Sequence, residues 1–252
     1  MSVVDGGKYG RGGLGNAARA EWTKLWSVRA PYLCLGAGAL VTGVFGFYYG
    51  AIARLNDHPV QPVGNAATAS VTLTQYAVVV LAMLMVTGEY VTGSMRTSLT
   101  WVPVRHRMQV AKAVVAGVTA FAAGLVYGVL GTAVAWPSFG GRATFGVGEA
   151  AWQVMGAGLY CALVAVLTVG VSFATRNAAG ALSVLFVLLT AGPTICVGLG
   201  GPLLLAVNDY LPQTAGGAFM AVAGGVGWLA VVAGWAAVAH LAGRQVLRVR
   251  DA

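Results

Sequence analysis

Side chains able to carry out chemistry are sparse in this sequence. Only seven of its 252 residues are Asp or Glu and only three are His. Asp57 and His58 are adjacent, but no other His is near them in sequence. One His beside one acid is too small a group to hold a metal ion or to pair a nucleophile with a base. The sequence therefore predicts a protein that is not an enzyme and has no metal site.

A nucleotide site is also not expected in this chain. The phosphate-binding loop pattern Gly-x-x-x-x-Gly-Lys-Ser/Thr does not occur. Gly10, Gly12 and Gly15 fit Gly-x-Gly-x-x-Gly, but no strand-like run precedes them and no βαβ pattern follows. We therefore expect this chain to bind no cofactor of its own.

Polar and charged groups are concentrated in one stretch between two apolar blocks. It opens with Gly88 and Glu89 and continues through a helix-compatible run at 94–101. Pro103 would end that run, and a basic cluster of Arg105, His106 and Arg107 follows it. The pattern predicts a short helix parallel to a membrane and anchored at both ends. An ordinary solvated loop whose charges set topology is the alternative.

The composition explains what must position this stretch. Hydrophobic residues make up 58% of the chain and charged residues 9%, whereas soluble domains carry about a quarter charged residues. The apolar residues form blocks of about twenty, long enough to cross a bilayer as helices. The predicted spans are 31–53, 69–87, 110–136, 152–174, 178–198 and 218–242. We therefore expect an all-α, polytopic membrane protein with six transmembrane helices.

The basic residues predict an orientation. Of the 15 Lys and Arg residues, only Arg54 and Arg142 fall on one side of the six spans and the other 13 on the opposite side. Cytoplasmic loops carry the excess of Lys and Arg, so both termini are expected in the cytoplasm, with the chain in the cell membrane. The net charge of +8 is not arranged as a basic stripe with interleaved aromatics, so no nucleic-acid partner is expected.

The segment before the first span has an amphipathic pattern. Ala18, Trp22, Leu25 and Trp26 share one stripe, with Lys24 on the other side. Asn16 is a plausible N-cap, and paired Trp residues beside basic ones are typical of a helix in the headgroup layer. The alternative is a soluble packing helix. The expected divisions are a disordered tail at 1–15, the interfacial helix at 16–29, the transmembrane domain at 30–243 and a basic tail at 244–252.

Several of these residues, taken in order, resemble the membrane subunit of ABC-2 type transporters. The matching residues are Glu89, Tyr90, Gly93, Ser94, Leu99, Pro103, Arg105 and Lys112. The likeness extends to the segments 20–25, 175–177 and 210–212, so it covers most of the chain. The order of these pieces together with six spans is more specific than any one of them.

This resemblance implies an exporter permease. It implies two separate ABC ATPase subunits that bind ATP and Mg²⁺, and a second permease copy or paralogue. The stretch after the second span would be the coupling helix, and the basic cluster would hold lipid headgroups or an acidic ATPase rim. The implied ATPase-coupling residues are Glu89, Tyr90, Gly93, Ser94, Arg96, Leu99, Pro103, Arg105, Arg107 and Arg176.

The fifth span carries a possible interruption. Gly192 and Pro193 could kink it, and Gly200, Gly201 and Pro202 could break it. The run 203–207 that follows is too short to cross a membrane. A re-entrant hairpin, which the resemblance also implies, and an irregular span end both fit this pattern.

Cargo is the least specified property. Candidate path residues are Phe45, Tyr48 and Tyr49 in the first span and Thr72, Gln75 and Tyr76 in the second. An interface belt and helix-packing hydrogen bonds are the alternatives for these side chains. A hydrophobic or amphipathic compound is expected from the resemblance.

The alternative functions are an ion-coupled carrier and a noncatalytic membrane scaffold. A carrier would need ionisable residues near mid-membrane. Glu89, Lys112 and His240 are instead expected near span ends, with His240 able to reach headgroups.

Overall fold

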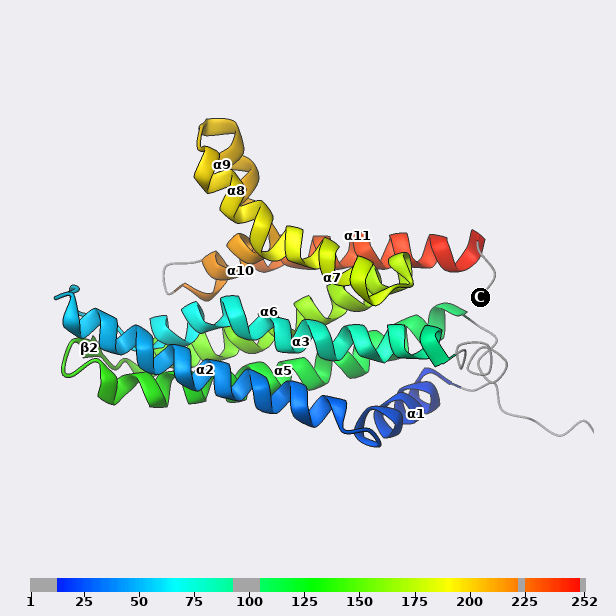
Figure 1. Ribbon diagram of the computed structural model, residues 1–252, viewed down its shortest axis with the longest axis horizontal. Helices are drawn as coiled ribbons and strands as arrows, with labels where there is room; N and C mark the ends of the chain where they lie inside the picture. The colour runs from blue at the N-terminus through cyan, green and yellow to red at the C-terminus, as the bar shows by residue number, and fades with distance from the viewer. Residues whose placement is uncertain (1–12, 93–104, 222–224, 250–252) are drawn as a thin grey trace, which may run out of the picture.

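The computed structural model describes residues 13–92, 105–221 and 225–249, and helices dominate them (Figure 1). The helices are α1 (Leu14–Trp26), α2 (Ala30–Leu55), α3 (Gly64–Thr92), α5 (Arg105–Ser138), α6 (Val147–Thr175), α7 (Ala178–Phe186), the π-helical turn η1 (Val187–Ala191), α8 (Gly192–Leu199), α9 (Pro202–Asp209), α10 (Pro212–Met220) and α11 (Gly227–Val249). Two short strands, β1 (Gln61–Pro62) and β2 (Ala143–Thr144), complete the described elements.

Six helical segments in the described part of the chain are long and apolar enough to cross a membrane. They are Ala30–Leu55, Gly64–Val91, His106–Ser138, Val147–Thr175, Ala178–Leu199 and Gly227–Leu247. The first five agree with the predicted spans to within about five residues at each end, the usual error of boundaries read from sequence. The prediction of a helical chain with six segments long and apolar enough to span a membrane is therefore confirmed.

The predicted start of the sixth span is wrong. The window placed it at Ala218, but that residue lies in α10, which ends at Met220 where Ala221 takes an extended conformation (φ −62°, ψ 142°). The helix that could cross a membrane starts at Gly227 and continues to Val249. A hydropathy window misses this break because the residues on both sides of it are mostly Ala, Val and Gly.

Helix α6 forms the centre of the bundle, packed against α3, α5 and α11. In its most apolar window 67% of the residues are buried, against 22% for α2 and 17% for the fifth and sixth spans. Close helix approach explains several glycines: a Cβ on Gly124 of α5 would lie 2.6 Å from the Ala157 carbonyl oxygen of α6. Small residues allow this approach between membrane helices.

The fifth span bends away from the bundle (Figure 1). In η1 the Gly192 N–H donates to the Val187 carbonyl, a π-type bond that interrupts the α-helical ladder just before Pro193. After α8 the chain reverses at Gly200 and Gly201, whose φ angles of 68° and 91° favour glycine. Helices α8 and α9 therefore form a short hairpin at the glycine and proline residues noted in the sequence.

The ends of the chain's helices group in space. Helix α1 and the end of α11 lie at the same end of the molecule, and the loops carrying β1 and β2 lie at the other (Figure 1). At that other end, Gln61 pairs with Ala143 in the parallel β1–β2 ladder, and Arg142 forms an ion pair with Asp57. The two loops are thus fastened to each other.

Candidate functional site: a buried charge cluster

Four charged side chains from three helices meet at the end of the bundle where α1 lies. We call Glu21 and Lys24 of α1, Glu89 of α3 and Lys112 of α5 the charge cluster. The Lys112 Nζ lies 2.6 Å from Glu21 Oε2 and 2.9 Å from Glu89 Oε1. It also donates to the Met85 carbonyl at 2.9 Å, and its side chain is only 1% exposed. Lys112 is therefore the buried centre of the cluster.

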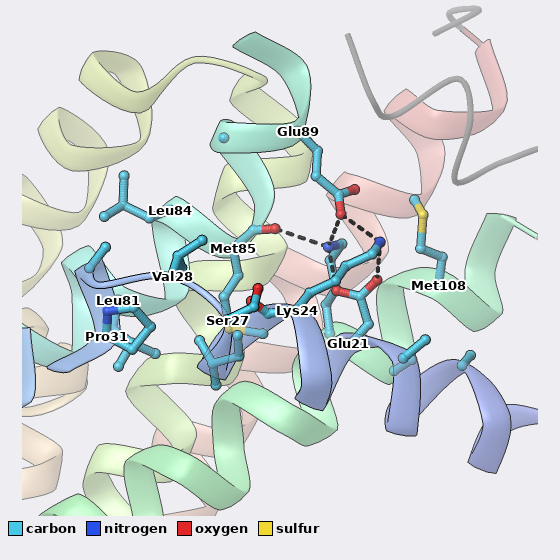
Figure 2. A pocket seen from close by; sticks show the side chains of 17 residues that line it. Glu21, Lys24, Ser27, Val28, Pro31, Leu81, Leu84, Met85, Glu89 and Met108 are labelled. Carbon is cyan, nitrogen blue, oxygen red and sulfur yellow. Dashed lines mark hydrogen bonds and ion pairs between the residues drawn. The ribbon is translucent and has the colours of Figure 1, made fainter. Parts of the chain in front are cut away.

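Lys24 forms the outer part of the same cluster. Its Nζ lies 3.1 Å from Glu21 Oε1 and 3.0 Å from Glu89 Oε1, and its side chain is 50% exposed. Figure 2 shows Glu21, Lys24 and Glu89 converging, with the bonds between them dashed. Partial burial by itself lowers the pKa of Lys24, but the two carboxylates outweigh it and raise that pKa above its usual value. Two positive and two negative groups leave the cluster neutral.

An apolar layer beneath the charges holds the three helices in register. Leu25 of α1, Leu81 of α3 and Val115 of α5 are buried against one another. Glu21 lies one turn from Leu25 on the same face of α1, which directs its carboxylate toward Lys112. The apolar contact thus sets where the ions meet.

The predicted face of α1 is only partly correct. The residues buried in α1 are Ala17, Glu21 and Leu25, whereas Trp22 is 44% exposed. The acid lies on the buried face because Lys112 neutralises it, and no residue-by-residue hydropathy pattern can represent that pairing. Asn16 is also not the N-cap: the helix begins at Leu14, and Gly13 caps it without a side-chain bond.

A second contact links the end of α3 to α6 and α11. Arg176 ends α6 in a left-handed conformation (φ 55°), and its Nη2 donates to the Val246 carbonyl of α11 at 3.1 Å. The guanidinium carbon lies 5.7 Å from the ring centroid of Tyr90 in α3, a cation–π distance. Two of the residues predicted to couple to an ATPase are therefore neighbours in space.

The other predicted coupling residues are only partly described. Gly93, Ser94, Arg96, Leu99 and Pro103, and the coupling helix to which they were assigned, lie outside the described residues. Arg105 is the first residue of α5, and Arg107, half-buried, lies in its first turn.

The candidate path residues do not gather at one site. Tyr49 packs on Phe139 and donates to Gln61 Oε1 at 3.3 Å, whereas Tyr48 is 63% exposed. Gln75 is fully buried and accepts a 2.6 Å hydrogen bond from the Tyr160 hydroxyl. Helix-packing bonds of this kind are the alternative noted above for the polar residues of the second span.

Three further path candidates complete this picture. Tyr76 shares a 2.7 Å hydrogen bond with Thr190 of η1, and Thr72 lies 3.5 Å from the Gln213 amide nitrogen of α10. Phe45 is half-buried in α2. The polar residues of α3 thus fasten neighbouring helices to one another.

His240 does not reach outward to headgroups as expected. Its Nδ1 lies 3.0 Å from Gln109 Nε2 of α5, and its Nε2 lies 2.9 Å from the Val166 carbonyl of α6. Both ring nitrogens are thus used between helices. Because α11 packs closely on α6, with Gly170 against the His240 backbone, the side chain is directed inward.

The charge cluster itself was not predicted. Its signal in the sequence is that Glu21 and Lys112 are ionisable residues next to apolar runs in separate segments, where an unpaired charge is costly. Opposite charges in separate segments, here Glu21 before the first span and Lys112 near the start of the third, are the observation that predicts such a pair.

Within the described residues no group of three or more His, Cys, Asp or Glu side chains is placed to hold a metal ion.

Comparison with known proteins adds no identification. No protein-family model matches this chain, and no curated protein matches it significantly. The likeness to exporter permeases therefore depends on the motif residues quoted above.

Proposed function

We propose that this chain is the permease subunit of an ATP-driven exporter of the ABC-2 type. In this proposal it sits in the cell membrane with both termini in the cytoplasm, pairs with a second permease, and exports a hydrophobic or amphipathic compound. The observation that carries the proposal is the charge cluster, because it joins α1, α3 and α5 at both ends of the segment 93–104.

The charge cluster is suited to transmitting movement between the ends of α1, α3 and α5. Glu89 lies just before that segment and Lys112 lies two turns after it, so a displacement of the segment acts on both. Separating a buried ion pair costs about 3–5 kcal/mol, so the three helix ends move as one body. The contact of Tyr90 with Arg176 extends this body to α6 and α11. Such rigid-body movement is a common way to transmit a change between sites.

Partner binding tests the proposal directly. Full-length protein, purified from its native membranes in mild detergent, is expected to carry an ATPase subunit with it. The complex reconstituted in lipid should hydrolyse ATP and change the distance between spin labels on α2 and α5 when ATP is trapped. Recovery of the chain without any ATPase, or transport by the chain alone driven by an ion gradient, would refute the proposal and favour a scaffold or a carrier respectively.

A variant separates coupling from assembly. Glu89→Gln should leave the complex assembled and hydrolysing ATP while abolishing the distance change, because α3 loses its ion pairs with Lys24 of α1 and Lys112 of α5. Glu149→Gln, at the other end of the bundle in the first turn of α6, is the matched control and should behave as wild type. Equal behaviour of the two variants would contradict the assigned role of the cluster.

The orientation has its own test. In a background with Cys34, Cys161 and Cys196 replaced by Ala, a membrane-impermeant thiol reagent added outside intact cells should label His58→Cys. It should label Arg19→Cys only after the membrane is opened. The reverse pattern would place the termini outside.

A further inference from the structure

A cavity lies beside the charge cluster, between α1, the start of α2, α3 and α5. Its volume is about 590 Å³, within the range of small-molecule sites. Glu21, Lys24, Glu89 and Lys112 line one part of it. Leu81, Leu84, Pro31 and Val28 line another part, and Figure 2 shows them on the side away from the charges. The cavity is therefore amphipathic.

The cavity is long enough along the helix axis to hold both the headgroup of a lipid and the start of its acyl chains. Leu81 and Glu89 are both on α3, and eight residues of helix correspond to about 12 Å along its axis. The charged part lies toward the end of the span and the apolar part toward its middle. A bound amphiphile would have its polar head at the cluster and its apolar chain at the level of Leu81.

The cluster determines which head is accepted. Lys112 is held by Glu21, Glu89 and the Met85 carbonyl and is 1% exposed, so it is committed to the protein. Lys24 is 50% exposed and is the outer ammonium of the cluster, so it is the one that can turn toward an incoming headgroup. An incoming phosphate would bind Lys24 in place of a carboxylate.

Charge balance at the cluster then favours a ligand that also carries a positive group. When Lys24 turns to a phosphate, Glu21 and Glu89 lose one of their two ammonium partners. A primary ammonium on the ligand restores that partner, because its N–H groups donate to carboxylates as the Lys24 ammonium did. A quaternary ammonium has no N–H to donate, and a purely anionic head brings no cation in place of the Lys24 ammonium.

We infer that this cavity binds a glycerophospholipid with a primary-amine headgroup, its phosphate on Lys24 and its ammonium on the carboxylates of Glu21 and Glu89. This inference goes beyond the proposed function and requires only that the chain lies in a bilayer. It stands or falls separately from any ATPase partner.

Lipid binding to the delipidated full-length protein, followed by native mass spectrometry, tests the inference. The probes are dioleoyl phosphatidylethanolamine, its N-methyl and N,N-dimethyl derivatives, dioleoyl phosphatidylcholine and dioleoyl phosphatidylglycerol. Affinity should fall with each N–H removed, to about tenfold weaker for the choline lipid, the size of one charge-assisted hydrogen bond. Equal affinity for ethanolamine and choline lipids, or preference for phosphatidylglycerol, would overturn the inference.

Two pairs of variants locate the site. Lys24→Gln should remove the preference for the ethanolamine lipid, whereas Arg19→Gln, also exposed on α1, should retain it. Ala20→Trp should block the cavity that Ala20 lines without changing any charge. Thr23→Trp, exposed on the same helix but not lining the cavity, is its control. Retained preference in both Lys24→Gln and Ala20→Trp would overturn the assignment to this cavity.

Discussion

Removing the central ammonium of the charge cluster should be among the most damaging single changes in this protein. Lys112→Met keeps the length and apolar stem of the side chain but deletes contacts of 2.6 Å to Glu21 and 2.9 Å to Glu89. Two nearly buried carboxylates, 7% and 13% exposed, then lose the central ammonium, and the half-exposed Lys24 lies beside both. Leaving a buried charge without its partner costs about 3–5 kcal/mol, so the free energy of unfolding should fall by that amount.

A double-mutant cycle separates the electrostatic part of this loss in the free energy of unfolding from the part due to packing. Glu21→Gln added to Lys112→Met leaves one carboxylate, Glu89, facing one ammonium, Lys24, at 3.0 Å. The double variant should therefore be more stable than the sum of the two single effects by about 2 kcal/mol, within the range found for residues in contact.

Equilibrium unfolding in mixed micelles of dodecyl sulfate and a mild detergent, followed by far-ultraviolet circular dichroism, measures these free energies. Arg19→Gln, which removes an exposed charge from α1, is the control and should change the value by less than about 0.5 kcal/mol. A loss below about 1 kcal/mol for Lys112→Met, or strict additivity in the cycle, would refute the cluster as a buried and coupled unit.

Three further outcomes follow from contacts elsewhere, each measured by the same unfolding assay. Gly124→Ala should destabilise by about 1–3 kcal/mol because its Cβ would lie 2.6 Å from a carbonyl oxygen, whereas Gly43→Ala, with open space around it, should not. Tyr160→Phe should cost about 0.5–2 kcal/mol by leaving the buried Gln75 carbonyl without its 2.6 Å donor, and an unchanged midpoint would contradict this. Because the pKa of Lys24 is raised in the folded protein, its contribution to the free energy of unfolding is complete below its unfolded pKa and is lost as the pH rises through its folded pKa. The free energies of unfolding of wild type and Lys24→Gln should therefore converge only in strongly alkaline solution.

Local hydropathy was sufficient to predict most of the spans, because a membrane helix must be apolar along its whole length. An interruption near Gly200 and Gly201 was also predictable, since these residues adopt backbone angles that other residues avoid, but the sequence left open whether a hairpin or an irregular span end forms there. The break after Met220 was not, because apolar residues continue through it. Helix existence depends on composition, whereas helix ends depend on packing partners.

The charge cluster could not be predicted from local hydropathy either, because it too depends on partners that are distant in sequence. A buried Glu21 is favourable only because Lys112 is beside it, and these residues are 91 positions apart. Periodicity within α1 favours the Trp residues for the packed face and cannot include that partner. The hydrogen bond between Gln75 and Tyr160 was unpredictable for the same reason, because its two partners lie in different helices, 85 positions apart.

The position of Lys112 has a consequence for how the protein is made. Helix α1 precedes α5 in the chain and is synthesised first, so the Glu21 carboxylate is already present when Lys112 emerges from the ribosome. A lysine near the end of an inserting helix is costly in hydrocarbon and holds that end at the surface. Pairing with Glu21 offsets part of this penalty once the two helices meet. The order of synthesis therefore makes α1 a docking point for the later span, and variants of Glu21 should lower the yield of correctly inserted chains as well as the stability of those that form.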